Sequence, residues 1–208
     1  AHADYRAAVI NTLEISAGAT LAAIFLGVPI AFCLARLPIP GKPLGVTLGT
    51  LPLLLPSFVS AHAWVLLLGR FGFVSRALRA VGIPFGSIYG REGMIFVYTI
   101  QGFPYVLLLA MSAFSAMDVS LEEAGENLGS SPWRTFRTVT LPLLIPAMLS
   151  GGLLVFMASA ENFGVPFVLA EDVPVLSVEA YKLFVSEMGG NPGMAGAMGV
   201  FLILCTAV

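Results

Sequence analysis

The sequence predicts an all-α integral membrane protein, a bundle of five membrane-spanning helices in which the last span is incomplete. Composition is the first observation behind this fold class. Of 208 residues, 58% are hydrophobic and only 11% are charged, whereas soluble domains carry about 25% charged residues. The second observation is that apolar runs of about 20 residues recur along the chain, and a helix of that length crosses a bilayer. Mean hydropathy is accordingly high, at +0.93.

The spans are expected in one domain of residues 1–208. The first covers 15–34, and the second covers 45–68 with Pro52 and Pro56 inside it. We expect a kink or break there, because membrane helices tolerate proline where neighbouring groups satisfy the freed carbonyls. Three further spans are expected at 94–116, 143–162 and 193–208. The chain begins without methionine and ends inside an apolar run, so we expect a piece of a longer protein.

Small residues in the fourth span, Ser150-Gly151-Gly152, suit close packing of that helix against a neighbour. The two cysteines both lie inside apolar runs. They are interpreted as small hydrophobic residues and not as a disulfide framework.

One long polar stretch, residues 121–142, interrupts the apolar sequence and is predicted to form two short helices separated by a glycine. Ser120 and Glu123 fit a capping box, in which each side chain bonds the backbone N–H of the other residue. Gly129 stands where the first helix should stop, because glycine adopts the left-handed conformation without a Cβ clash. Ser131-Pro132 then predicts the N-cap and first position of the second helix, with Arg134 and Arg137 toward its C-terminal end.

The spacing in this stretch resembles the EAA loop of ABC importer permeases. The family pattern is Glu-Ala-Ala, three residues, Gly, nine residues, Ile, one residue and Leu-Pro. The chain has Glu123-Ala124-Gly125, Gly129, Val139 and Leu141-Pro142 at the same spacing, and departs only in Gly125 and Val139. The resemblance implies the five-helix core of a type I ABC importer permease in the bacterial inner (cytoplasmic) membrane. Residues 118–142 would be its cytoplasmic coupling-helix loop.

The resemblance also implies a transport subunit that is not itself an enzyme and has no catalytic residue. The chain has no glycine-rich phosphate-binding loop, so ATP and Mg²⁺ belong to a partner ATPase, and no cofactor is expected on this chain. The other expected partners are a periplasmic or lipoprotein substrate-binding protein, membrane lipid and a second permease bundle, with no nucleic acid. That second bundle is either an identical subunit or the other half of a fused chain.

The residues expected to couple the permease to the ATPase all come from the polar stretch. The alternative for Glu123 is a plain helix cap, which is compatible with docking. The alternative for Arg134 and Arg137 is a surface that faces solvent or lipid headgroups. The coupling candidates are Glu122, Glu123, Ala124, Gly125, Gly129, Arg134, Leu141 and Pro142.

Polar side chains within the spans are the candidates for the translocation path, because such groups usually face the bundle interior or water. They are Glu161, Asn162, Gln101 and His62. The alternative for Glu161-Asn162 is an interfacial pair at the end of the fourth span, and for Gln101 and His62 an interhelical hydrogen bond. No span holds His, Cys or carboxylates at metal-ligand spacing, so no metal site is expected.

A second resemblance bears on the substrate. Phe163-Gly164-Val165-Pro166, Leu169 and Tyr181, together with Asn11-Thr12-Leu13 and the segment 35–42, resemble ferric-iron and polyamine importer permeases. This resemblance implies ferric iron as the substrate, with a polyamine or another small solute as the alternative. A secondary transporter driven by an ion gradient would favour paired carboxylates in mid-span or an inverted repeat, and the sequence contains neither.

Charge alone favours the opposite orientation to the one the family implies. The positive-inside rule compares lysines and arginines in the loops on the two sides of the membrane. Residues 35–44 and the polar stretch hold four, against six on the other side, namely Arg6, Arg70, Arg76, Arg79, Arg91 and Lys182. We take the orientation from the resemblance, which places the polar stretch in the cytoplasm.

Overall fold

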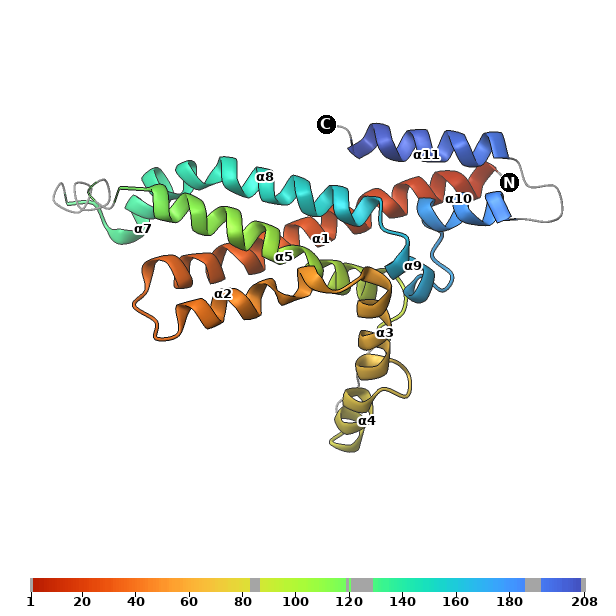
Figure 1. Cartoon of the computed structure of the whole chain (residues 1–208), viewed down its shortest axis with the longest axis horizontal. Coiled ribbons are helices and arrows are strands. Elements are labelled where there is room, and N and C mark those ends of the chain that lie inside the picture. Colours follow the sequence, from red (N-terminus) through yellow and green to blue (C-terminus); the bar gives the residue numbers. More distant parts are fainter. Residues whose placement is uncertain (1, 83–86, 119, 121–128, 186–191, 207–208) are drawn as a thin grey trace.

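Three long helices run side by side through the centre of the protein (Figure 1). The computed structural model describes residues 2–82, 87–118, 120, 129–185 and 192–206, and this part of the chain is helical without strands. The central helices are α1 (His2–Arg36), α5 (Arg91–Ala116) and α8 (Leu141–Ala160), and α8 continues from α7 (Pro132–Thr135) and η2 (Phe136–Thr140). The all-helical fold class is therefore confirmed.

Four helical stretches among the described residues have the length and apolar composition needed to cross a membrane. They are Tyr5–Arg36, Ser57–Ala80, Arg91–Ala116 and Pro132–Ala160. The first and third helices begin earlier than the predicted spans 15–34 and 94–116, and the fourth span ends at Ala160 instead of residue 162. The expected last span corresponds to α11 (Pro192–Thr206).

Glycines allow the central helices to approach closely. A Cβ atom on Gly151 of α8 would lie 2.9 Å from the Cα atom of Val106 in α5, and one on Gly102 would lie 2.7 Å from a methyl carbon of Val155. A Cβ atom on Gly152 would lie 3.0 Å from the terminal methyl carbon of Ile24 in α1. The close packing expected from Ser150-Gly151-Gly152 is thus found at both glycines.

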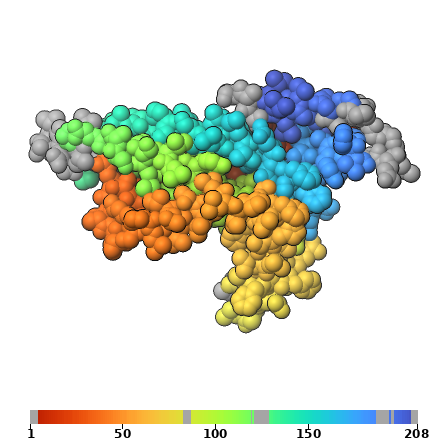
Figure 2. Space-filling model, in the orientation of Figure 1, coloured from red at the N-terminus to blue at the C-terminus, as the bar shows by residue number. Residues whose placement is uncertain are grey.

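The second predicted span, 45–68, is divided into helices that point in different directions. Its parts are α2 (Lys42–Thr50), the 3₁₀ turn η1 (Leu51–Leu54) and α3 (Ser57–Leu68). Leu55 has an extended backbone (φ −89°, ψ 125°), as expected for the residue before a proline, and Pro56 has no N–H to continue a helix. The predicted break is therefore real, and α3 leaves the bundle together with α4 (Phe73–Ala80) as a projecting arm (Figures 1 and 2).

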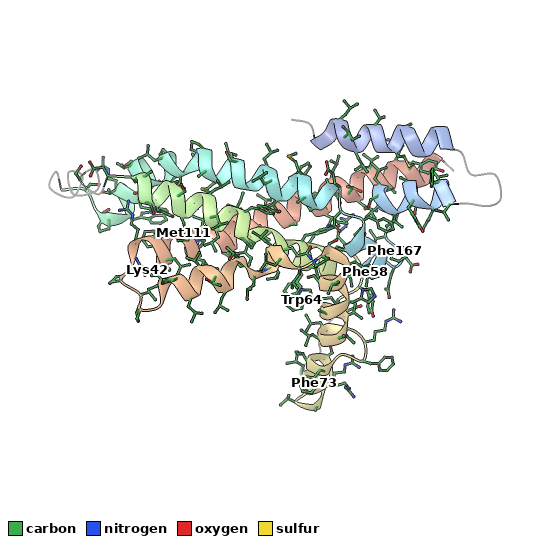
Figure 3. All side chains as sticks on the ribbon, viewed as in Figure 1. Lys42, Phe58, Trp64, Phe73, Met111 and Phe167 are labelled. Atoms are coloured by element: carbon green, nitrogen blue, oxygen red, sulfur yellow. The ribbon has the colours of Figure 1, made fainter. Side chains whose placement is uncertain are left out.

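The start of the arm packs against α9 (Gly164–Leu169). Figure 3 shows Phe58 of α3 next to Phe167 of α9, with ring centroids 6.4 Å apart. A Cβ atom on Gly164 would lie 2.8 Å from the backbone nitrogen of Phe58, so only glycine fits at this contact without displacement. The chain then continues through α10 (Leu176–Val185) to α11.

Ionic and polar contacts fasten the N-terminal half of α1 to its neighbours. Arg91, at the start of α5, contacts Glu14 at 2.5 Å and donates to the side-chain oxygen of Asn11 at 2.6 Å. The side-chain nitrogen of Asn11 donates in turn to the backbone oxygen of Pro174 at 2.9 Å. These contacts hold α1, α5 and the segment before α10 together at the end of the bundle opposite α7 (Figure 1).

Candidate functional site: the coupling loop and an uncharged pocket

The described end of the polar stretch forms a tightly defined turn into a helix. Gly129 has φ +83°, the left-handed conformation that the sequence predicted. Ser131 accepts a hydrogen bond from the backbone N–H of Arg134 at 3.4 Å, and Pro132 occupies the first turn. The predicted N-cap and helix start are therefore confirmed at Ser131-Pro132.

Asp118 makes a side-chain contact at the other end of the loop. The backbone N–H of Ser120 donates to Asp118 Oδ1 at 2.9 Å. This bond, together with one from the Ser120 side chain, lowers the pKa of the Asp118 carboxyl group and keeps it charged at neutral pH. The coupling candidates Glu122, Glu123, Ala124 and Gly125 lie outside the described residues, and so does the second half of the capping box.

The second helix of the polar stretch was expected to end before the fourth span. Instead, it runs on into that span. The wide turn η2 joins it to α8, and the N–H of Leu141 bonds the carbonyl of Phe136 five residues earlier. This wider turn accommodates Pro142, which has no N–H of its own to donate. Arg134 and Arg137 are both exposed and sit near the beginning of a helix that continues to Ala160, not at a C-terminal end.

The loop is consequently connected to the bundle by one continuous helix, Pro132–Ala160. Thr135 and Thr140 are buried within its first part, whereas the Trp133 side chain is 70% exposed and stacks on Phe136 with ring centroids 5.7 Å apart. A displacement of the turn at Gly129 would therefore be transmitted along α8 into the centre of the bundle.

We expect replacement of Ser131 by alanine to destabilise this helix start by about 1 kcal/mol, the usual cost of losing an N-cap side chain. Ser130 provides the matched control, because its hydroxyl only reaches the carbonyl of Ser131 at 3.5 Å and caps nothing. Thermal unfolding of the detergent-solubilised protein should give a lower midpoint for Ser131→Ala than for Ser130→Ala. Equal midpoints would show that the cap contributes nothing.

A pocket of about 150 Å³ lies where the second span breaks. It is bordered by η1 and the start of α3 on one side and by α5 and α8 on the other. Polar groups and apolar surface alternate around it, and none of the described residues that line it is charged. The lining residues that can hydrogen-bond through their side chains are Ser57, Tyr98, Gln101, Tyr105, Ser159 and Asn162.

Gln101 stands out within this pocket. Its side-chain nitrogen Nε2 is buried and has no hydrogen-bond partner among the described residues. The interhelical hydrogen bond offered as the alternative for Gln101 is thus not made by this nitrogen. A buried donor without a partner is costly, and a water molecule or a solute in the pocket would satisfy it.

Asn162 reaches the same pocket but also acts as a structural joint. Its Oδ1 accepts from the backbone N–H of Val165 at 3.0 Å, and its backbone oxygen accepts from the Ser177 hydroxyl at 2.9 Å. Asn162 therefore fixes the turn from α8 into α9 and its contact with α10.

The structure does not place the other two path candidates in this pocket. His62 is exposed on α3, where Nδ1 bonds the carbonyl of Phe58 at 2.9 Å and the ring packs on that phenylalanine. His62 lies outside the pocket that Gln101 lines, because α3 turns away from the bundle at Pro56, and its place on the path stays a prediction. Glu161 is exposed directly after α8 ends, which agrees with its alternative as a residue at the end of the span.

The path candidates predicted from the sequence did not include four pocket residues, namely Ser57, Tyr98, Tyr105 and Ser159. The available signal was the pair Pro52 and Pro56, since an interrupted helix often borders a ligand site in membrane proteins. Among the described residues, no group of three or more His, Cys, Asp or Glu side chains is placed to hold a metal ion.

A bundle of apolar helices, a polar loop joined to it by a continuous helix, and a pocket without charge in its described lining together agree with a membrane transport subunit. The chain belongs to the family of binding-protein-dependent transport system inner membrane components, whose family model matches residues 23–208. It is accordingly a multi-pass inner-membrane permease subunit of an ABC importer, which orients the 118–142 loop toward the cytoplasm.

Named relatives and a solved structure agree with this family. The molybdenum transport system permease protein of Escherichia coli K12 is 33% identical over 193 residues, 90% of this chain and 83% of that protein. A probable sulfate transport system permease protein of Chlorokybus atmophyticus is 31% identical over 86% of this chain and 62% of that protein. A chain of the inward-facing methionine ABC transporter MetNI has the same fold, with a TM-score of 0.72 at 15% identity over 96% of this chain and 88% of that one. These names give no support to the ferric-iron expectation.

Proposed function

We propose that this permease imports a tetrahedral oxyanion of the molybdate or sulfate class. The similarity to molybdenum and sulfate permeases over most of the chain carries this proposal. The uncharged pocket agrees with it, because its hydroxyl and amide groups can donate hydrogen bonds to an anion, and its described lining has no carboxylate to attract a cation. The oxyanion replaces ferric iron and polyamines as the expected substrate.

The energy for import comes from ATP and Mg²⁺ bound by partner ATPase subunits, which dock at the 118–142 loop. The supporting features are the rigid turn at Gly129 and the continuous helix that leads from it into the bundle. A binding protein outside the membrane delivers the oxyanion, and a second permease bundle, either identical or fused to this one, completes the path. The polar stretch thus works as a mechanical connection and performs no chemistry.

Transport in liposomes tests the substrate and the energy source together. The permease should be reconstituted with its partner ATPase, and the binding protein should be supplied outside together with labelled molybdate. We expect uptake that requires ATP and the binding protein, and that unlabelled sulfate or tungstate reduces. The proposal fails if only ferric iron or a polyamine accumulates. It also fails if uptake follows a proton or sodium gradient without ATP, as in a secondary transporter.

A further inference from the structure

The geometry assigns the pocket at the break of the second span as a transient binding site for the oxyanion inside the permease, with Gln101 as its central donor. This inference rests on the proposed function and adds a site to it. A cavity needs about 10–15 Å³ to hold one water molecule. The pocket has a volume of about 150 Å³, which is sufficient for a small oxyanion.

The buried nitrogen of Gln101 is the observation that favours a ligand in this pocket. Among the described residues it has no hydrogen-bond partner, although it lies on the most deeply packed helix of the bundle. Folding alone would favour an apolar side chain of the same shape at this position, because an unpaired buried donor destabilises a protein. A solute that passes through the pocket would give the nitrogen the partner it lacks.

Residues with hydroxyl groups line the same space from three helices. Tyr98 and Tyr105 stand one turn before and one turn after Gln101 on α5, while Ser57 and Ser159 come from α3 and α8. Tyr98 is only 5% exposed, so its side chain is held in one place by its neighbours. The Ser159 hydroxyl donates to the carbonyl of Val155 at 2.7 Å, so the candidate hydroxyl donors to the oxygen atoms of a tetrahedral anion are those of Tyr98, Tyr105 and Ser57.

The start of α3 adds a favourable electrostatic field. This helix begins at Ser57, a pocket residue, and its N-terminal end carries the positive pole of the helix dipole. An anion at a helix N-terminus is stabilised without any fixed cation. The break at Pro56 therefore both opens the space and turns a positive helix end toward it.

The lack of charge in the described lining suits passage better than tight binding. A translocation site must bind well enough for the solute to enter and weakly enough for it to leave. A buried arginine would hold a dianion too firmly, and a carboxylate would repel it. Neutral donors lie between these extremes and still distinguish an anion from a cation.

Two substitutions at Gln101 test the site in the reconstituted complex with ATPase and binding protein. Gln101→Met keeps the shape and removes the donor, and Gln101→Glu places a carboxylate in the pocket. We expect labelled molybdate uptake to fall by about tenfold to a hundredfold with Met, the effect of losing one hydrogen bond to a charged group. Uptake should fall further with Glu. The thermal unfolding midpoint of Gln101→Met should equal or exceed that of the wild type.

Substitutions at two tyrosines provide a second test that leaves Gln101 unchanged. Tyr105→Phe removes a pocket hydroxyl and should lower uptake. Tyr181→Phe removes a hydroxyl that lies outside the pocket, on a ring packed against Phe163, and should leave uptake unchanged.

The site is refuted if Gln101→Met and Gln101→Glu both transport molybdate at the wild-type rate, while the proposed substrate then still stands. It is also refuted if Gln101→Met loses uptake together with thermal stability, because Gln101 would then have a structural role. A wild-type complex that does not import oxyanions at all would instead overturn the proposed function.

Discussion

Replacing Gly129 with proline is expected to reduce ATP-driven uptake on the order of a hundredfold, the loss typical of a misplaced positioning element. The permease should still insert in the membrane. Gly129 has φ +83°, whereas the proline ring fixes φ near −65°. The turn cannot keep its present course with that restriction, so the helix that begins at Pro132 would leave the loop in another direction. The measurement is uptake per inserted permease, together with ATP hydrolysis.

Gly41 provides a matched control for this substitution. It has φ +80° and lies in the turn between α1 and α2, at the same end of the bundle as α7 (Figure 1). Gly41→Pro should strain the protein to a similar extent, yet leave uptake per inserted molecule near the wild-type value. Wild-type transport by Gly129→Pro would remove the coupling role from this turn. An equal loss in both variants would mean that general strain, and not the coupling loop, explains the effect.

Replacing Gly151 with alanine is expected to destabilise the permease by about 1–3 kcal/mol, the usual cost of inserting a methyl group into a filled interior. The new Cβ would stand 2.9 Å from the Cα atom of Val106, and a backbone atom cannot move aside as the end of a side chain can. The helices α5 and α8 would have to separate, which would also disturb the pocket between them. Thermal unfolding of the solubilised protein measures the loss.

The adjacent Gly152 provides a control for Gly151→Ala in the same helix. Its added Cβ would meet the terminal methyl of Ile24 at 3.0 Å and a methyl of Thr20 at 3.2 Å, and both are side-chain atoms that can shift more easily than a backbone atom. Alanine is also favoured over glycine in a helix by about 1 kcal/mol. Gly152→Ala should therefore be neutral or slightly stabilising. If the two alanine variants unfolded at the same temperature, the close contact of Gly151 with the α5 backbone would not contribute to stability as predicted.

Several features could be predicted from neighbouring residues alone, because their physical cause is local. Proline at residue 56 stops a helix wherever the chain goes, and Gly129 accepts a left-handed backbone in any surroundings. Ser131-Pro132 likewise carries its own cap. Apolar runs of span length follow from the bilayer, and the spacing of the polar stretch indicated the family that the comparison confirmed.

Features that depend on direction in space were predicted less well. The polar stretch was expected to end in a separate second helix, but the wide turn η2 carries that helix directly into α8. His62 and Gln101 were both candidates for the translocation path, and the angle of α3 after Pro56 places only Gln101 in the pocket. A sequence shows that a chain must bend at a proline, and it does not show where the next helix will point.

Neighbouring residues were enough to predict the membrane-helical class, the position of the break in the second span and the glycine turn of the loop, since each depends on interactions within a few residues. Which polar side chains meet could be learned from the folded structure alone. Gln101 and Asn162 are 61 positions apart and share a pocket because glycines bring α5 and α8 into contact. Such a meeting depends on how helices pack, and packing is set by the shapes of whole surfaces and not by adjacent residues.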